Sequence, residues 1–581
     1  MGGGQDQKRV FLAIALSVVV IALWQVFFVP EPPPPGEAGS DAGVIANGAD
    51  AGAQPAGVPP AAVAGDPAGT PDGAPAVAAP DATPVRVIAP QDVVLEAESF
   101  KATLTNRGAR LKHFFVQSPL QYQPRGDLLQ PGPLDGETEQ EPPPENFETF
   151  LSLATQLGGE LRLNEQAMYD VVESGPDKAV FRHTDPAGRY TVTKTFTVGS
   201  RPHTIELAVV LENKQPAGVL TDELEVVNYG RQKEGDGDWS LFDPIPNTME
   251  AVCYAGGDAE RMPRDDAAEK PSIPGPITWG GVDTRYFTNV VIPAEPFEKC
   301  RIGLEQREFF RMAVVSPKFT LEPGQSKTWL LSSYVGPKEI EAMASFTVGL
   351  EESVDYGVFA FLCRPFRWVL VHFEGWVGNW GLAIILLTLG LRMLLFPVNQ
   401  KAYGNMEGMR RLQPQLEVMR AKYKNDPQRL NTEMMKLYQQ ENVSMFGCLP
   451  MFIQIPIFFA FYRTIYNSVE LYHADFALWY TDLSAPDPYY VLPVIVTGLM
   501  MGQQFFMPQT AQNAQMKVMM WMMPIMFGVF TFVLPSGLGL YLTVSVSLGI
   551  AQQYYIRRRL KAKNGDTPAP AGPKKAKKAK A

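Results

Sequence analysis

The feature that most constrains this 581-residue chain is the crowding of its apolar residues into residues 10–29 and into the last third. The first run, VFLAIALSVVVIALWQVFFV, is long enough to cross a hydrocarbon core of about 30 Å as a helix. Lys8 and Arg9 precede it, which favours a cytoplasmic N-terminus. A cleaved signal peptide is the alternative, but the run is long for one and PEPPPP follows it. We therefore predict an uncleaved signal-anchor helix within residues 1–29.

Apolar segments of the last third predict further membrane-spanning helices. They cover residues 379–398 and about 446–466, 489–507, 517–534 and 538–556. An apolar and aromatic segment before them, 357–375, carries Arg364, Pro365 and Arg367 and is too interrupted to span. We predict that it forms an amphipathic helix in the plane of the lipid headgroups. The fold class is therefore a six-span membrane protein, with a core of five helices over residues 379–556.

The charges of the connecting segments predict the orientation. Residues 399–444 hold eight Lys and Arg residues, whereas residues 468–488 hold none. Because Lys and Arg accumulate in cytoplasmic loops, both termini should be cytoplasmic. The acidic stretch from about 30 to 345 would then lie outside the cytoplasm.

Two regions separate the anchor from the helical core. Residues 30–90 are dominated by Pro, Ala and Gly, which predicts a flexible-to-extended linker. Residues 91–345 contain short alternating runs such as YTVTKTFTV and HTIELAVVLE, which predict a large antiparallel β-sandwich. Its histidines, His113, His183 and His203, are scattered in strand-like runs, where an ordinary structural histidine is the better interpretation.

The chain has four cysteines and no C-x-x-C pair, which argues against zinc, iron–sulfur and thioredoxin-type chemistry. Cys253 and Cys300 fall in the region placed outside the cytoplasm, where a disulfide can persist. The sequence is compatible with a disulfide between Cys253 and Cys300 and with two free thiols. We find no phosphate loop, catalytic cluster or metal-ligand spacing, and predict no cofactor, no metal and no enzymatic activity.

Arg392 is the most informative residue of the predicted spans. A central arginine costs about 2.5–3.5 kcal/mol on insertion scales, so it usually faces protein or a wet cavity. The alternative is snorkelling to the cytoplasmic end of the helix. Thr388 lies one turn earlier on the same face. Polar residues of other spans, together with Arg392, predict a hydrophilic groove that opens to the cytoplasm, although each could equally make a helix–helix hydrogen bond. These residues are Gln454, Gln503, Gln504, Thr543, Ser545, Ser547 and Gln552.

Residues 399–444 predict a cytoplasmic helical hairpin, with Asp426 as the N-cap of its second arm and Pro427 at the first helical position. Its methionines form either the seam of the hairpin or a soft surface for apolar clients. These are Met406, Met409, Met419, Met434 and Met435. The basic tail, 557–581, is either a solvated charge run or an arm for ribosomal RNA or anionic lipid. The lysines of that arm are Lys574, Lys575, Lys577 and Lys578.

Residues 350–560 resemble the Gram-negative type of the YidC/Oxa/Alb family of membrane protein insertases. The likeness rests on VGNWGLAIILLTLGLRMLLFPVNQKAY, CLPMFIQIPIFFAFY, FALWYTDLSAPDPYYVLP and PSGLGLY. It implies a five-helix insertase core around a cytoplasm-open groove and a periplasmic β-super-sandwich. It also implies partners: nascent membrane proteins as clients, the Sec translocon with its accessory subunits, translating ribosomes and the lipid bilayer.

The resemblance assigns roles by position. Arg392 matches the family's groove arginine and Thr388 its neighbour. Gln454 and Phe458 match third-span groove or slide positions, and Phe530 matches a fifth-span one. Met526 belongs to the methionine-rich fifth span, which we predict to be a pliable slide for client helices.

Two motifs depart from the family pattern. Ser444-Met445 stands where the family has Asn-Pro, and Tyr541-Leu542 stands where it has paired tyrosines. Two rival functions also stay open. A solute transporter predicts repeat symmetry between halves, which we do not find. A membrane-anchored carbohydrate-active enzyme predicts a carboxylate or histidine site in the β-domain, which the sequence does not single out.

Overall fold

The computed structural model describes residues 88–119, 127–129, 147–159, 161–232, 249–263, 266–267, 270–305, 309–423, 426–441, 449–505 and 514–564. These residues belong to one compact unit, which begins at Ile88. The predicted anchor, all but the end of the linker 30–90 and the four tail lysines lie outside the described residues.

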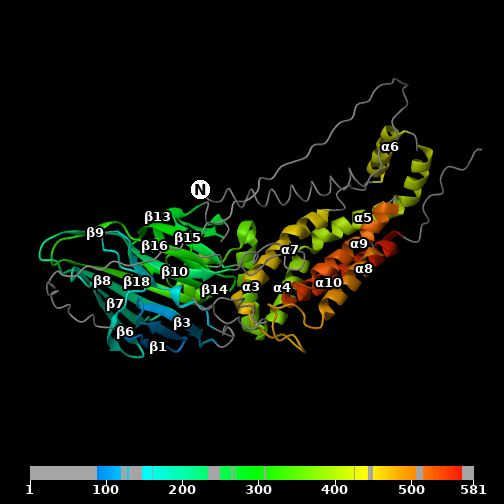
Figure 1. Ribbon diagram of the computed structural model, residues 1–581. Coiled ribbons are helices and arrows are strands. Elements are labelled where there is room, and N and C mark those ends of the chain that lie inside the picture. The colour runs from blue at the N-terminus through cyan, green and yellow to red at the C-terminus, as the bar shows by residue number, and fades with distance from the viewer. Residues whose placement is uncertain are drawn as a thin grey trace, which may run out of the picture. The chain divides into compact units, whose positions relative to one another are not determined.

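The β-domain is built entirely from antiparallel strand pairs within the described residues (Figure 1). The strands are β1 Asp92–Glu96, β2 Phe100–Thr105, β3 Arg110–Val116, β4 Ala154–Leu157, β5 Asp170–Ser174, β6 Lys178–Thr184, β7 Tyr190–Val198, β8 Thr204–Asn213, β9 Leu220–Asp222, β10 Leu224–Arg231, β11 Glu250–Ala255, β12 Asp258–Met262, β13 Ser272–Asp283, β14 Phe287–Pro293, β15 Phe297–Leu304, β16 Phe309–Val315, β17 Phe319–Leu321 and β18 Ser326–Pro337. The predicted antiparallel β-rich domain is confirmed.

The strands form a 13-stranded sheet whose main path runs β4-β10-β16-β15-β13-β14-β18-β8-β7-β6-β5, with β11 and β12 attached to β13. A three-stranded sheet, β1-β2-β3, and a two-stranded sheet, β17-β9, accompany it. Period-two alternation explains the packing of β8, where Ile205, Leu207, Val209 and Leu211 are all buried in the domain core.

Cys253 of β11 and Cys300 of β15 form a disulfide, with their Cα atoms 6.6 Å apart. The two strands pair with different halves of β13, and Gly280 of β13 lies opposite Cys253. A Cβ at Gly280 would lie 2.4 Å from Met312 Cε and 3.2 Å from Cys300 Sγ. The missing side chain of Gly280 therefore leaves room for the buried bridge.

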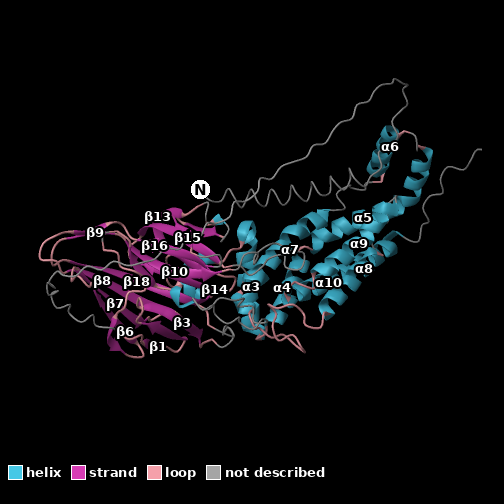
Figure 2. Cartoon of the chain, in the orientation of Figure 1, coloured by secondary structure: helices cyan, strands magenta, loops and turns pink. Residues whose placement is uncertain are grey.

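The helical part follows the β-domain in sequence and is coloured cyan in Figure 2. Its helices are α2 Ile340–Ala344, α3 Ala360–Val377, α4 Trp380–Leu394, α5 Phe396–Lys422, α6 Pro427–Gln440, α7 Leu449–Asn467, α8 Val491–Gln504, α9 Ala514–Phe530 and α10 Ser536–Asn564. Short 3-10 turns are η2 Phe147–Thr149, η4 Leu350–Ser353, η5 Gly357–Phe359 and η7 Val469–Leu471.

The helix predicted over residues 379–398 is wrong in its C-terminal boundary. α4 ends at Leu394, and α5 starts at Phe396 after a bend of 59°. Pro397 explains the break, since it has no N–H to donate to the backbone oxygen of Met393 and its ring would clash with that oxygen in a continuous helix. Taken singly, no helix in the described part of the chain is long and apolar enough to cross a bilayer. Residues 380–394 and 396–409 meet that test together, across the bend.

Helices α5 and α6 cover most of the segment 399–444, for which a cytoplasmic hairpin was predicted. The side chain of Asp426 accepts a hydrogen bond from the backbone N–H of Arg429 at 3.0 Å, and Pro427 opens the helix, as predicted. The first arm begins earlier than residue 399, because α5 runs without interruption from the bend.

The β-domain and the helical part share their cores. Arg285, between β13 and β14, donates from Nε to the backbone oxygen of Tyr466 at 2.7 Å, and its guanidinium lies 3.3 Å from the centre of the Tyr466 ring. Tyr472, from the segment after α7, packs in the β-domain core. In return, Trp279 and Tyr334 of the sheet pack in the helical core.

Candidate functional site

Arg392 points from α4 toward α10. Its Nη2 donates a hydrogen bond to Ser545 Oγ at 2.6 Å, and a Cβ at Gly549 would lie 3.7 Å from its Nη1. The side chain is half-buried, and no described carboxylate forms an ion pair with it. The guanidinium thus contacts a neighbouring helix through a neutral hydroxyl, and no described residue neutralises its charge.

Thr388 lies on the buried face of α4, one turn before Arg392, and only 1% of its surface is exposed. Its hydroxyl donates to the backbone oxygen of Ile384 at 2.7 Å. This is the usual bond of a threonine to its own helix, so the hydroxyl proton is already used. Thr388 extends the buried surface of α4 toward Arg392, and its one donated bond stays within the helix.

A second hydrogen bond joins α7 to α10. Gln454 Nε2 donates to the hydroxyl of Tyr541 at 2.8 Å. The Tyr541 ring stacks on Phe461 with ring centres 4.1 Å apart. Tyr541 and Ser545 are one turn apart on α10, so they share a face. Three residues predicted from the sequence, Arg392, Gln454 and Ser545, therefore converge on α10, together with Tyr541.

The same face of α10 stays polar toward its C-terminal end. Gln552 Nε2 donates to the backbone oxygen of Phe396 at 3.3 Å, immediately after the bend between α4 and α5. Gln553 is 7% exposed, and neither polar atom of its amide has a hydrogen-bond partner in the part of the chain that the structure describes. Buried amides without a protein partner usually bind water, so this end of α10 can hold ordered water.

Sequence reasoning missed Gly549 and Gln553. Their signal was present, because Ser545, Gly549 and Gln553 recur at intervals of four residues and so lie along one face of a helix. Because Gly549 has no side chain, the guanidinium of Arg392 can approach α10 closely.

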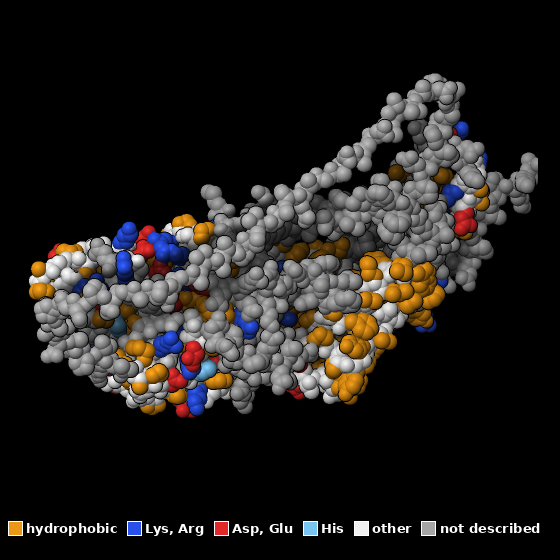
Figure 3. Space-filling view, viewed as in Figure 1, with side chains coloured by type: hydrophobic (Ala, Val, Ile, Leu, Met, Phe, Trp, Pro, Cys, Tyr) orange, Lys and Arg blue, Asp and Glu red, His pale blue; other side chains and the backbone are white. Residues whose placement is uncertain are grey.

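The predicted slide residues of α7 and α9 lie near one another. Phe458 contacts Phe527 edge-on, with ring centres 5.7 Å apart, and Phe527 in turn lies 6.4 Å from Phe530. Met526 is 62% exposed on α9. Figure 3 shows hydrophobic side chains gathered over the surface of the helical part. The arrangement offers an apolar surface beside the aromatic contacts between the two helices.

The hairpin buries leucines more deeply than methionines. Leu412 and Leu416 of α5 are buried, whereas Met409, Met419 and Met434 are half-buried and Met435 is exposed. The side chain of Met406 lies outside the described part of the chain. The methionines therefore border the seam, and both interpretations of them remain predictions.

Helix α3, Ala360–Val377, covers most of the segment 357–375, for which an interfacial helix was predicted. Phe361, Trp368 and Trp376 are exposed along one face, while Phe366 and Leu370 are buried on the other. The two arginines of α3 differ. Arg364 is exposed and pairs with Glu352 at 2.7 Å. Arg367 is buried and pairs with Glu470 before α8 and with Glu341 of α2, at 2.8 Å for the latter.

Comparison with known proteins identifies the chain. Residues 372–564 match the family described as 60Kd inner membrane protein, and residues 92–369 match the family described as YidC periplasmic domain. Together they define an inner-membrane protein with a large periplasmic domain. The chain belongs to the YidC family of membrane protein insertases.

Curated relatives match over nearly the full length. The membrane protein insertase YidC of Anaeromyxobacter dehalogenans strain 2CP-1 is 33% identical over 584 residues, which cover 98% of this chain and 100% of the relative. The YidC of Geotalea daltonii is 30% identical over 568 residues, covering 96% and 100%.

Solved structures are more distant. The crystal structure of an active YidC insertase with its first transmembrane domain resolved is 18% identical, with a TM-score of 0.36 over 81% of this chain and 93% of that one. A putative aldose 1-epimerase of Escherichia coli is 13% identical, with a TM-score of 0.30 over 43% of this chain and 100% of that one. At these scores neither likeness bears on the site.

Proposed function

We propose that this protein inserts, folds and assembles integral membrane proteins in the bacterial inner membrane, alone or with the Sec translocon, through a hydrophilic groove that contains Arg392. The observation that carries the proposal is the hydrogen bond from Arg392 to the neutral hydroxyl of Ser545. A cation so bonded can still attract an acidic group from a client. Gln454 and Tyr541 supply further polar groups on the same face of α10.

The mechanism needs no covalent chemistry. A short hydrophilic segment of the client enters the groove, where Arg392 attracts its acidic side chains. The segment then has less hydrocarbon to cross. Meanwhile the apolar helix of the client moves past Phe458, Met526 and Phe530 into lipid, and the burial of its apolar surface supplies the driving force.

The proposed topology has six spans with both termini in the cytoplasm. They are the N-terminal anchor, α4 with the first turns of α5, α7, α8, α9 and α10. The disulfide between Cys253 and Cys300 supports a periplasmic β-domain, because disulfides persist in oxidising compartments. The exposed Trp368 and Trp376 of α3 support its place at the membrane interface.

The cytoplasmic parts would receive the clients. In this proposal the hairpin of α5 and α6 contacts emerging apolar segments through Met409, Met434 and Met435. The basic tail, with Lys574 and its neighbours, holds ribosomal RNA or anionic lipid, and its binding should weaken as the salt concentration rises.

The charge of Arg392 can be tested by insertion assays in proteoliposomes. Arg392→Glu should impair most strongly those clients whose translocated tails carry Asp and Glu. Arg392→Lys, the matched control, retains the charge and should insert the same clients at near wild-type levels. Clients with uncharged tails should respond least. Equal insertion of acidic-tail clients by Arg392→Glu and wild type would contradict the proposal.

Site-specific photo-crosslinking tests the path of the client. A photoreactive residue at Gln454 or Phe530 should crosslink to a nascent membrane protein. The same residue at Val494, which is 65% exposed on α8, serves as the control. Crosslinks of equal yield from all three positions would show general lipid-mediated contact and would contradict a defined path.

A further inference from the structure

A cavity of about 980 Å³ opens in the β-domain, away from the helical site. Among the described residues, its lining consists of glycine, threonine and charged side chains. They are Gly158, Gly159, Arg162, Arg189, Thr221, Asp222, Glu223, Glu225, Arg301 and Lys318. Ligand sites of this size are usually lined mainly by apolar side chains. The lining therefore does not suit apolar client segments or lipid tails and requires a ligand that is hydrophilic throughout.

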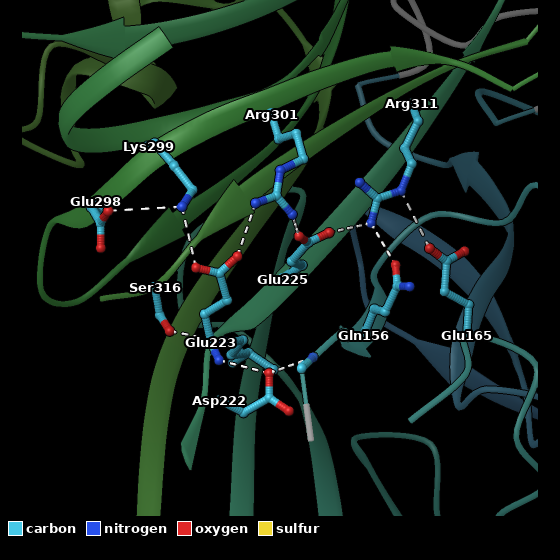
Figure 4. A network of polar contacts seen from close by, with 12 residues as sticks. Gln156, Glu165, Asp222, Glu223, Glu225, Glu298, Lys299, Arg301, Arg311 and Ser316 are labelled. Carbon is cyan, nitrogen blue, oxygen red and sulfur yellow. Dashed lines mark hydrogen bonds and ion pairs between the residues drawn. The ribbon is translucent and has the colours of Figure 1, made fainter. Parts of the chain in front are cut away.

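The carboxylates of the cavity are held by cations of the sheet (Figure 4). Glu223 accepts from Lys299 at 3.2 Å and from Arg301 at 2.8 Å. Glu225 lies between Arg301 and Arg311 and pairs with both. These pairs fix the carboxylates in ionised form and leave further lone pairs that can accept hydroxyl donors.

Asp222 has a different role. Its Oδ1 accepts the backbone N–H of Gly159 at 2.9 Å, and its Oδ2 accepts that of Leu161 at 3.1 Å. The carboxylate thus holds the loop that leads to Arg162. Leu161 and Leu163 are both buried, which anchors the backbone on either side of Arg162.

Arg162 and Lys318 are two exposed cations of the cavity. Neither has a hydrogen-bond or ion-pair partner among the described residues. Arg162 also has a φ of 51°, a left-handed conformation that is unfavourable for a non-glycine residue. Such strain persists where the surroundings hold the backbone, and it concentrates at functional sites.

We infer that this cavity binds an acidic sugar, meaning a hydroxyl-rich ligand that carries a single carboxylate or phosphate group. Arg162 and Lys318 hold the oxyanion, which a guanidinium can bind through two parallel hydrogen bonds. Glu223, Glu225 and the hydroxyl of Thr221 accept or donate hydrogen bonds to the sugar hydroxyls. The four cations of the lining, Arg162, Arg189, Arg301 and Lys318, outnumber its three carboxylates, which favours an anion over a cation.

Isothermal titration of the full-length protein in nanodiscs tests the inference. The probes are galacturonic acid, glucose 6-phosphate, glucose and inorganic phosphate. The two acidic sugars should bind saturably, and at least tenfold more tightly than glucose or inorganic phosphate. The relative affinities of galacturonic acid and glucose 6-phosphate distinguish a carboxylate ligand from a phosphate ligand. Absence of saturable binding by both, or equal binding of glucose or inorganic phosphate, would overturn the inference.

Variants locate the site. Arg162→Gly removes the guanidinium while its backbone accepts the left-handed conformation, so the fold should persist. Lys318→Glu reverses an exposed charge. Each should weaken acidic-sugar binding at least tenfold, with an unchanged thermal unfolding curve. Lys101→Glu, at an exposed position of β2 outside the cavity, is the matched control and should bind like the wild type. Binding that survives both cavity variants would place the sugar elsewhere and refute the assignment.

Discussion

Lys338 of the β-domain and Arg392 of the helical part hold their charges in opposite ways. In the β-domain, Lys338 and Asp283 are both buried and pair at 2.7 Å, and Arg311 pairs with Glu225. In the helical core, Arg392 contacts the neutral Ser545. A paired charge is neutralised and holds the structure, whereas an unneutralised charge remains available to a ligand. Under the proposed function, the difference separates charges that stabilise the protein from a charge that acts on clients.

Removal of Lys338 should have the largest effect on stability. Lys338→Met leaves the buried Asp283 with Arg261, 3.8 Å away, as its remaining described ion-pair partner. Breaking a buried pair from one side costs about 3–5 kcal/mol. Urea denaturation of the purified protein, followed by tryptophan fluorescence, measures the loss. Lys178→Met breaks the exposed pair with Glu173 and should cost under about 1 kcal/mol. Equal losses of stability in the two variants would show that the buried pair stabilises the β-domain no more than the exposed pair does.

The disulfide should have the next largest effect. The double variant Cys253→Ala/Cys300→Ala opens a cross-link between residues 47 positions apart, which should cost about 2–4 kcal/mol of stability. The same urea titration measures it. Reductant should destabilise the wild type and leave the double variant unchanged. A wild type that is insensitive to reductant in the unfolding transition would show that the bridge does not cross-link the mature domain.

His203 of the β-domain is buried, and neither of its ring nitrogens has a hydrogen-bond partner among the described residues. Burial lowers its pKa from 6.5 to about 4. The folded state therefore resists protonation, while the unfolded state takes up a proton as the pH falls below 6.5. The domain should lose up to about 3 kcal/mol of stability from this group between pH 7 and pH 4.

Comparison with a variant isolates the contribution of His203. His203→Asn does not titrate, and asparagine tolerates the φ of 55° at this position. Its stability should fall less steeply between pH 7 and pH 4 than that of the wild type, measured by urea denaturation at each pH. Parallel curves for the two proteins would show that His203 is not the titrating group.

Much of the fold could be predicted from local sequence pattern. Period-two alternation located the strand at β8, and the Asp426-Pro427 pair located the start of α6. The bend at Leu395 was missed, because the apolar run continues unchanged through Phe396-Pro397 and hydrophobicity carries no information on direction. Pro397 was the signal. A proline inside an apolar run predicts a kink or a break in the helix at that point.

The contacts between distant residues could not be predicted in the same way. Sequence composition identified Arg392 and Ser545 as candidates, but not their bond across 153 positions. Likewise the disulfide depends on the space above Gly280, which only the strand register creates. No local sequence pattern predicts the Lys338–Asp283 pair. Asp283 is the last residue of β13, and Lys338 directly follows β18.

The smallest expected effect on stability concerns Arg392 itself. Arg392→Met removes a cation that no described residue neutralises and puts an apolar side chain of similar length against Gly549. The cost should stay under about 1 kcal/mol, because the variant loses one hydrogen bond to a neutral hydroxyl and sheds the desolvation penalty of the charge. Insertion of clients with acidic tails should nevertheless fall sharply. Urea denaturation and the proteoliposome assay on one preparation measure both quantities. If Arg392→Met lost as much stability as Lys338→Met, Arg392 would stabilise the helical core. Its role would then be structural, like that of the paired charges of the β-domain.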